Sequence, residues 1–270
     1  MTLRKKQDIK DNREWIEAFN DCLKVVSFER IKEIEAKTIE AIRRVSKGYT
    51  KICSGWIAGK DSIVLNSILE KSGIDFTPIM WRGVNEWECM KEWISNNKPN
   101  NIIFEIIDKF DFPFLEKHPD YLFCRGNTRQ PLMAEKWKRQ NSDIRKHGFD
   151  LFVVGRRIKD GNQCGSKKSE FIVKKQGYDV FAPLAEWTHE EMLAYIKYNN
   201  IELPPFYSFP RGFLIGSIAM GEWTEYAALN KTETEVWDEI YSIEPDTVIN
   251  AAKHLTAAKK YLETRYKNEN

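Results

Sequence analysis

Residues 54–62 read Ser-Gly-Trp-Ile-Ala-Gly-Lys-Asp-Ser and carry the strongest fold signal in the chain. A strand-like run over 49–53 precedes them, and apolar residues at helical spacing follow from Ile63 to Leu69. A strand, a turn of small residues and a helix together direct backbone N–H groups and the positive end of the helix dipole toward an anion. The stretch therefore predicts an anion-binding loop; a surface turn between a buried strand and helix is the alternative.

The loop is not a Walker A motif. That motif requires Ser or Thr directly after its Lys, whereas Asp61 follows Lys60 here. Residues 57–62 instead resemble the pyrophosphatase loop, S-G-G-x-D-S, of the adenine nucleotide alpha-hydrolase superfamily. Gly59, Asp61 and Ser62 agree with that motif, and Ile-Ala at 57–58 replaces its Ser-Gly. Within the superfamily, the sequence is most similar to the branch of PAPS (phosphoadenylyl sulfate) reductases and ATP sulfurylase small subunits.

Three later stretches resemble the same branch in the same order. Residues 124–132 are similar to its Cys-x-x-x-Lys-x-x-Pro-Leu segment, with the basic residue, Arg129, one position after that of the Lys, and residues 183–191 are similar to its P-[IL]-x-x-W-[ST]-x-x-[DE] signature. Residues 155–157 are similar to its G-x-R segment, after which only Asp160 matches the family's acidic residue. The order of the matches favours the resemblance over chance.

The resemblance implies a set of nucleotide-binding residues. Glycine at 155 would let the backbone approach the nucleotide, and the arginines would contact phosphate or sulfate oxygens. Lys60 and Ser62 would hold pyrophosphate, and Asp61 would help to position Mg²⁺. We expect catalytic roles for Lys60, Asp61, Arg156 and Arg157, and nucleotide-binding roles for Gly59, Ser62, Arg125, Arg129, Gly155 and Asp160. Solvated helix residues are the alternative for Arg156 and Arg157.

Strand-length apolar runs alternate with helical patterns over most of the chain. The runs lie at 49–53, 76–81, 101–107, 148–154 and 180–184. This alternation predicts an α/β fold with a doubly wound, mostly parallel, five-stranded sheet. We expect a helical extension over 1–48, a nucleotide-binding domain over 49–207 and a C-terminal loop and helical region over 208–270. The Gly-, Ser- and Lys-rich segment 164–177 is predicted to be a mobile loop.

Charge is distributed unevenly along the chain. The formal net charge is only +2, but residues 125–175 hold 14 of the 42 basic residues and 5 of the 40 acidic ones. A basic segment of this kind favours an anionic partner, either a nucleotide or a nucleic acid, although solvated basic helix faces would look the same. The N- and C-terminal helical segments of the chain could also support a homodimer.

Cysteine usage and hydropathy point to a cytoplasmic protein. The five cysteines are scattered without a C-x-x-C pair, which argues against a zinc ribbon and suits reduced thiols. Neither a signal peptide nor a membrane span is expected. Ser217 and Met220 stand where relatives that ligate iron–sulfur have cysteines, so we predict no cluster.

Three functions follow as hypotheses. The first is an enzyme that cleaves ATP between its α and β phosphates and transfers the adenylyl group with release of pyrophosphate. The second is thiol-dependent reduction of PAPS, for which Cys124 and Cys164 are the candidate nucleophiles because each lies beside basic residues. The third is a non-catalytic nucleotide- or DNA-associated regulatory protein.

Overall fold

The protein is described by a computed structural model. Of its 270 residues, it describes 8–9, 11–216, 223–224, 226 and 231–269. The chain divides into two compact units, which are treated separately below. Unit 1 comprises Met1–Met80, Lys98–Glu105 and Gln140–Ser217, and unit 2 comprises Trp81–Asn97, Ile106–Arg139 and Ile218–Asn270.

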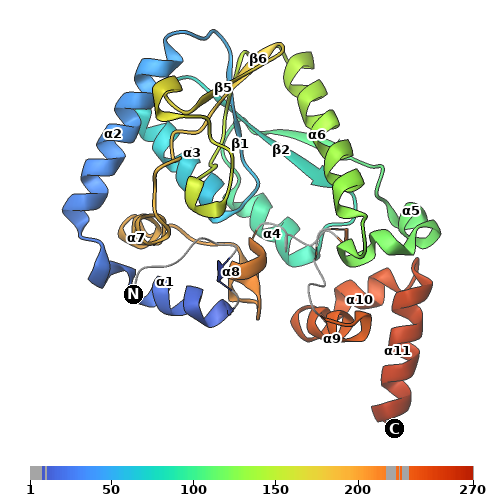
Figure 1. Cartoon of the computed structure of the whole chain (residues 1–270). Helices are drawn as coiled ribbons and strands as arrows, with labels where there is room; N and C mark the ends of the chain where they lie inside the picture. Colours follow the sequence, from blue (N-terminus) through green and yellow to red (C-terminus); the bar gives the residue numbers. More distant parts are fainter. Residues whose placement is uncertain (1–7, 10, 217–222, 225, 227–230, 270) are drawn as a thin grey trace. The chain divides into compact units, whose positions relative to one another are not determined.

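A six-stranded sheet with the order β3-β2-β1-β4-β6-β5 forms the centre of the fold (Figure 1). Its strands are β1 (Ile52–Gly55), β2 (Thr77–Gly83), β3 (Ile103–Ile107), β4 (Leu151–Val153), β5 (Ile172–Lys175) and β6 (Tyr178–Phe181). β1 pairs in parallel with β2 and β4, and β4 pairs in parallel with β6. The predicted α/β class and mostly parallel sheet are therefore confirmed.

The sheet has one strand more than the sequence predicts. β5 pairs antiparallel with β6, with Lys175 opposite Tyr178, inside the segment expected to be a loop. Lysines at 174 and 175 are exposed and hide the strand pattern. Charged, exposed residues are typical of edge strands, where they discourage further pairing.

The direction of the chain reverses between β1 and β4. Helix α3 (Lys60–Ser72) leads from β1 outward to β2, whereas α6 (Arg129–Lys146) leads back to β4 on the other side of β1. Right-handed crossovers place these two helices on opposite faces of the sheet, as Figure 1 shows. The loops after β1 and β4 thus leave the same edge of the sheet at its switch point, where ligands of such folds bind.

The described part of unit 1 contains four more helices: α1 (Asn12–Val25), α2 (Phe28–Ser46), α7 (His189–Tyr198) and the short α8 (Gly212–Ile215). α2 begins at the Ser27 cap and packs against α3, and α1 contacts α7 and α8. The shared core includes Val64, Leu65 and Ile68 of α3, which are fully buried. Short 3₁₀ turns lie at Ile158–Asp160, Lys167–Ser169 and Pro205–Ser208.

Unit 2 is mainly helical. Besides the first part of α6, it holds α4 (Glu88–Asn97), α5 (Phe112–Lys117), η2 (Pro119–Cys124), α9 (Glu233–Ile243), α10 (Pro245–Ala251) and α11 (Thr256–Glu269). Its core is aromatic: the rings of Trp87 and Tyr226 lie 5.2 Å apart, and those of Phe123 and Trp237 lie 4.8 Å apart. Packing therefore accounts for several of the nine tryptophans. Over the described part of the chain, none of the helices could span a membrane.

Candidate nucleotide-binding site

The loop after β1 is held by its own side chains. Gly59 precedes the first residue of α3, and the Ser62 hydroxyl donates to the Gly59 carbonyl at 2.9 Å and accepts from the Ile57 N–H at 3.1 Å. Ala58 is fully buried with a φ of 53°, in the left-handed region that favours glycine. Ser62 thus stabilises the turn, and Ala58 occupies the position at which the superfamily motif has Gly.

Asp61 joins the loop to the segment after β4. Its carboxylate accepts from Lys60 Nζ at 2.7 Å and from Arg157 Nε at 2.8 Å. Gly155 makes this approach possible, because a Cβ atom there would lie 2.8 Å from the Asp61 carbonyl oxygen. The structure therefore brings together the loop and the arginine segment, both of which the resemblance assigns to nucleotide binding.

Arg157 is fully buried and its guanidinium group is saturated by unit 1 itself. Besides Asp61, it pairs with Asp160 at 3.0 Å and donates to the Thr188 carbonyl at 3.1 Å. Arg157 thus ties β4 to the start of α7 and fixes the Asp61 carboxylate. In this arrangement Arg157 orients Asp61. A phosphate at the loop would contact other groups before it reached Arg157.

His189 lies beneath this network and is fully buried. Burial, followed by the positive charges of Arg157 and Lys60, lowers the pKa of His189 to about 3, so the imidazole is neutral at neutral pH. Its Nδ1 lies 3.3 Å from Arg157 Nη2, and its Nε2 has no hydrogen-bond partner among the residues that the structure describes.

Tyr207 caps the first amide of α3. Its hydroxyl oxygen accepts a hydrogen bond from the Lys60 N–H at 2.7 Å, and burial raises its pKa well above the ordinary value, with a further contribution from the Asp61 charge. A phosphate oxygen bound by the loop would need the same amide. Sequence reasoning missed this role, although Tyr207 stands in the position of the family's N-P-L-Y loop.

The N-terminal helix covers the loop lysine. Trp15 of α1 is fully buried, its ring lies 5.6 Å from Lys60 Nζ and 4.6 Å from the His189 ring, and it stacks on Phe213. The Asn12 side chain accepts from the Phe213 N–H at 3.1 Å, which fixes α1 against α8. The amphipathic pattern of the N-terminal segment indicates a packed helix, but nothing in it indicates which residue it covers.

Arg156 differs from Arg157 in its surroundings. It is half-buried and makes no ion pair with any described carboxylate. It lies near Lys175, whose pKa is lowered by burial and by the positive charge of Arg156. The exposed Ile57 side chain, 41% accessible, does not fill the loop. Arg156 is therefore the arginine with a charge available for an anion.

Two of the predicted binding residues belong to unit 2. Arg125 pairs with Glu233 at 2.6 Å, and Arg129 is exposed at the start of α6. Of the two candidate nucleophiles, Cys164 is a poor one in this structure. Burial raises the pKa of Cys164, and it likewise raises the pKa of Cys89, to about 12.

The residues present do not fit a resident magnesium ion. Both carboxylate oxygens of Asp61 already bind cationic groups, and the described residues contain no group of three or more His, Cys, Asp or Glu side chains that could hold a metal. Magnesium that arrives bound to a nucleotide would be part of the substrate. Ser217 and Met220, on which the iron–sulfur prediction rests, lie outside the described residues.

Comparison with protein families identifies part of the chain. Residues 112–213 match the family described as the phosphoadenosine phosphosulfate reductase domain. The resemblance of this part of the chain to the phosphoadenosine phosphosulfate reductase family is thereby confirmed. The matched segment includes the Gly155–Arg157 stretch and Tyr207, and the loop at 54–62 lies before it. No curated protein sequence matches the chain.

Two solved structures are similar to the chain at low identity. One is the crystal structure of a phosphate complex of PAPS reductase from Candida auris, with 16% identity, a TM-score of 0.48, and coverage of 66% of this chain and 90% of that one. The other is NMN synthetase from Francisella tularensis, with 14% identity, a TM-score of 0.38, and coverage of 89% of this chain and 96% of that one.

Proposed function

We propose that unit 1 binds an adenine nucleotide at the switch point of the sheet and cleaves it between the α and β phosphates, with adenylyl transfer and release of pyrophosphate. The ion pair between Asp61 and Arg157 carries this proposal, because it puts the loop and the segment after β4 within 2.8 Å of each other. The family match supports nucleotide binding, and the chemistry is our inference.

Each group has a defined part in this reaction. The amides at the start of α3 and Lys60 hold the pyrophosphate leaving group, and Arg156 stabilises negative charge on the transferred group. Arg157 positions Asp61, which holds Lys60 until the phosphates arrive. Adenylyl transfer depends mainly on positioning and electrostatics, so the protein needs no nucleophilic side chain.

Nucleotide binding requires Lys60 to change partners. The ammonium group is paired with Asp61 and covered by Trp15, and its backbone amide is capped by Tyr207. The ammonium group and the backbone amide of Lys60 are therefore already bonded within the protein. This arrangement favours a second candidate function, a regulatory protein that binds nucleotide without turnover. In such a protein the phosphates would not displace Asp61 from Lys60 far enough for adenylyl transfer.

The thiol-dependent alternative receives less support from the site. PAPS reduction by a cysteine needs a thiolate of lowered pKa that can reach the sulfate. Burial raises the pKa of the Cys164 thiol instead, despite the positive charges of Arg156 and Arg157 nearby. Cys124 belongs to unit 2 and has a left-handed backbone with a φ of 52°.

Turnover separates the two candidates. The full chain is incubated with ATP, Mg²⁺ and candidate acceptors, sulfate among them, and pyrophosphate release is measured beside ATP binding by calorimetry. If the protein is the proposed enzyme, pyrophosphate is released. Arg156→Gln should then abolish the release, and the exposed control Lys47→Gln should leave it unchanged. Binding without release selects the regulatory candidate. Absence of ATP binding overturns both.

A further inference from the structure

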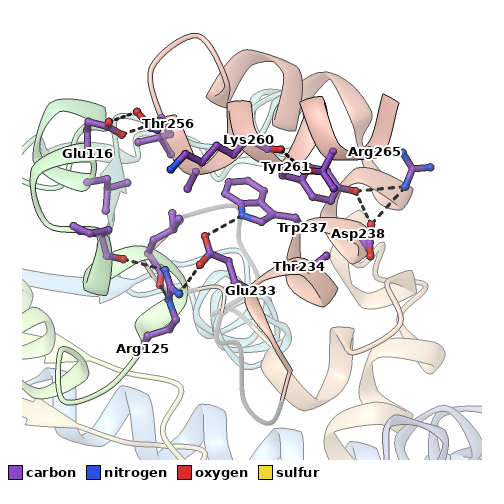
Figure 2. Close-up of a pocket in the computed structure, with 16 residues that line it drawn as sticks. Glu116, Arg125, Glu233, Thr234, Trp237, Asp238, Thr256, Lys260, Tyr261 and Arg265 are labelled. Atoms are coloured by element: carbon purple, nitrogen blue, oxygen red, sulfur yellow. Dashed lines mark hydrogen bonds and ion pairs between the residues drawn. The ribbon is translucent and has the colours of Figure 1, made fainter. Parts of the chain in front are cut away.

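Unit 2 contains a cavity of about 730 Å³ (Figure 2). It lies between α5 and η2 on one side and α9 and α11 on the other. Every residue that lines it belongs to unit 2. Its volume is within the range of pockets that bury small organic ligands.

The cavity has an apolar and aromatic wall. Leu115, Leu122 and Leu255 contribute aliphatic surface, and Trp237 and Tyr261 contribute rings. The polar atoms of both rings are already paired: Trp237 Nε1 donates to Glu233 at 3.3 Å, and the Tyr261 hydroxyl donates to Asp238 at 2.7 Å. This wall therefore offers a ligand an apolar packing surface on which the polar atoms of both rings need no further hydrogen bond.

Three cations and three carboxylates line the cavity, and two of the cations are held in ion pairs. Arg125 is paired with Glu233 at 2.6 Å, and Arg265 with Asp238 at 3.5 Å. Glu116 accepts from the Thr256 N–H at 2.9 Å and from the Thr256 hydroxyl.

Lys260 is the third cation of the lining. It lines the cavity, and its ammonium group forms no hydrogen bond or ion pair with the parts of unit 2 that the structure describes. Hydrogen bonds from Thr256 lower the pKa of Glu116, and the positive charge of Lys260 lowers it further, so the two charges also attract each other. In Figure 2 its side chain extends across the pocket above Trp237. An ammonium group with no hydrogen-bond partner among the described residues of unit 2 thus lies at the cavity beside the apolar wall, near the Glu116 carboxylate.

We propose that this cavity binds a small organic monoanion with a flat apolar body, such as an aromatic carboxylate. The carboxylate pairs with Lys260, and the body packs against the apolar wall. A polyphosphate suits the site poorly, because the carboxylates of Glu116, Glu233 and Asp238 also line it and would repel additional negative charge. The proposal is independent of nucleotide binding in unit 1.

A pair of isosteric probes tests the charge requirement. Naphthalene-2-carboxylate and neutral naphthalene-2-carboxamide are titrated into the full chain by calorimetry and by tryptophan fluorescence. We expect the carboxylate to bind at least tenfold more tightly than the amide. Lys260→Met should weaken carboxylate binding about tenfold, the loss expected for one charged hydrogen bond. Lys259→Met, an exposed neighbour that does not line the cavity, should have no effect.

A second variant tests the location. Ala257→Leu adds volume at the half-buried wall and should weaken carboxylate binding, while circular dichroism verifies that the variant folds. Three results would each overturn the proposal: no carboxylate binding at millimolar concentration, equal binding of acid and amide, or equal losses in Lys260→Met and Lys259→Met.

Discussion

The Asp61 carboxylate lies 2.8 Å from Nε of Arg157, although the two residues are 96 positions apart in the chain. This contact connects the loop after β1 to the end of β4 through a side chain that is itself fully buried. The nucleotide site is built around it: Lys60 shares the same carboxylate, and Asp160 shares the same guanidinium group.

Removing the buried guanidinium should strongly destabilise the protein. Arg157→Met leaves the largely buried Asp160 without its cation and leaves Asp61 with Lys60 alone, and breaking a buried pair in this way typically costs about 3–5 kcal/mol of the free energy of unfolding. Urea denaturation measures the loss. The matched control, Arg44→Met, removes the exposed pair with Glu170 and should cost less than about 1 kcal/mol. Similar losses in both variants would contradict the assigned role.

Backbone strain at residue 58 should be relieved by glycine. Ala58 has a φ of 53°, and an L-residue in this region is disfavoured by about 1 kcal/mol relative to glycine. Ala58→Gly should therefore keep or raise the melting temperature, although it removes a buried methyl group. Gly73→Ala is the mirror experiment. Its φ is 69° and a Cβ there would meet nothing within 4 Å, so any loss of stability comes from the backbone alone. A clear drop in Ala58→Gly would show that the methyl group matters more than the strain.

Removing the Tyr207 hydroxyl should free the first amide of α3 for a phosphate. Tyr207→Phe deletes the acceptor of the Lys60 N–H, so we expect ATP to bind more tightly while the protein loses about 1 kcal/mol of stability. Calorimetric titration with ATP measures the first effect. Tyr49→Phe, which deletes a hydroxyl bonded to Asp179 at 2.6 Å, is the control and should leave ATP affinity unchanged. Weaker ATP binding in Tyr207→Phe would mean that the hydroxyl helps to bind the nucleotide.

His189 should make the protein acid-sensitive. Its pKa is about 3 in the folded protein against 6.5 for the free side chain, so below pH 6.5 the unfolded chain takes up a proton that the folded protein does not. Stability is therefore fully present above pH 6.5 and falls toward pH 3, by about 1.4 kcal/mol per pH unit for this group. Urea denaturation at pH 7 and pH 5 should show a steeper decrease for the wild type than for His189→Asn. Parallel pH dependence would contradict the assignment.

The sequence predicts five of the six strands because their signals are local. A few consecutive residues are enough to recognise each of these signals: the apolar strand runs, the small residues before α3 and the Gly155–Arg157 segment. Arg156 and Arg157 cannot be told apart in this way, because their difference lies in which carboxylates the fold brings near. Lys60 contacts Trp15 and Tyr207, which lie 45 and 147 positions away along the chain. No sequence motif indicates that Trp15 packs on Lys60. Strand β5 was hidden by its exposed lysines.

The affinity for ATP against AMP in the wild type and in Lys60→Met tests the central claim most directly, since only ATP carries the β and γ phosphates assigned to the loop. The account predicts that calorimetry will show ATP binding at least tenfold more tightly than AMP, and that Lys60→Met will remove this preference while AMP binding persists. Equal affinities for ATP and AMP in the wild type, or an ATP preference that survives in Lys60→Met, would contradict it.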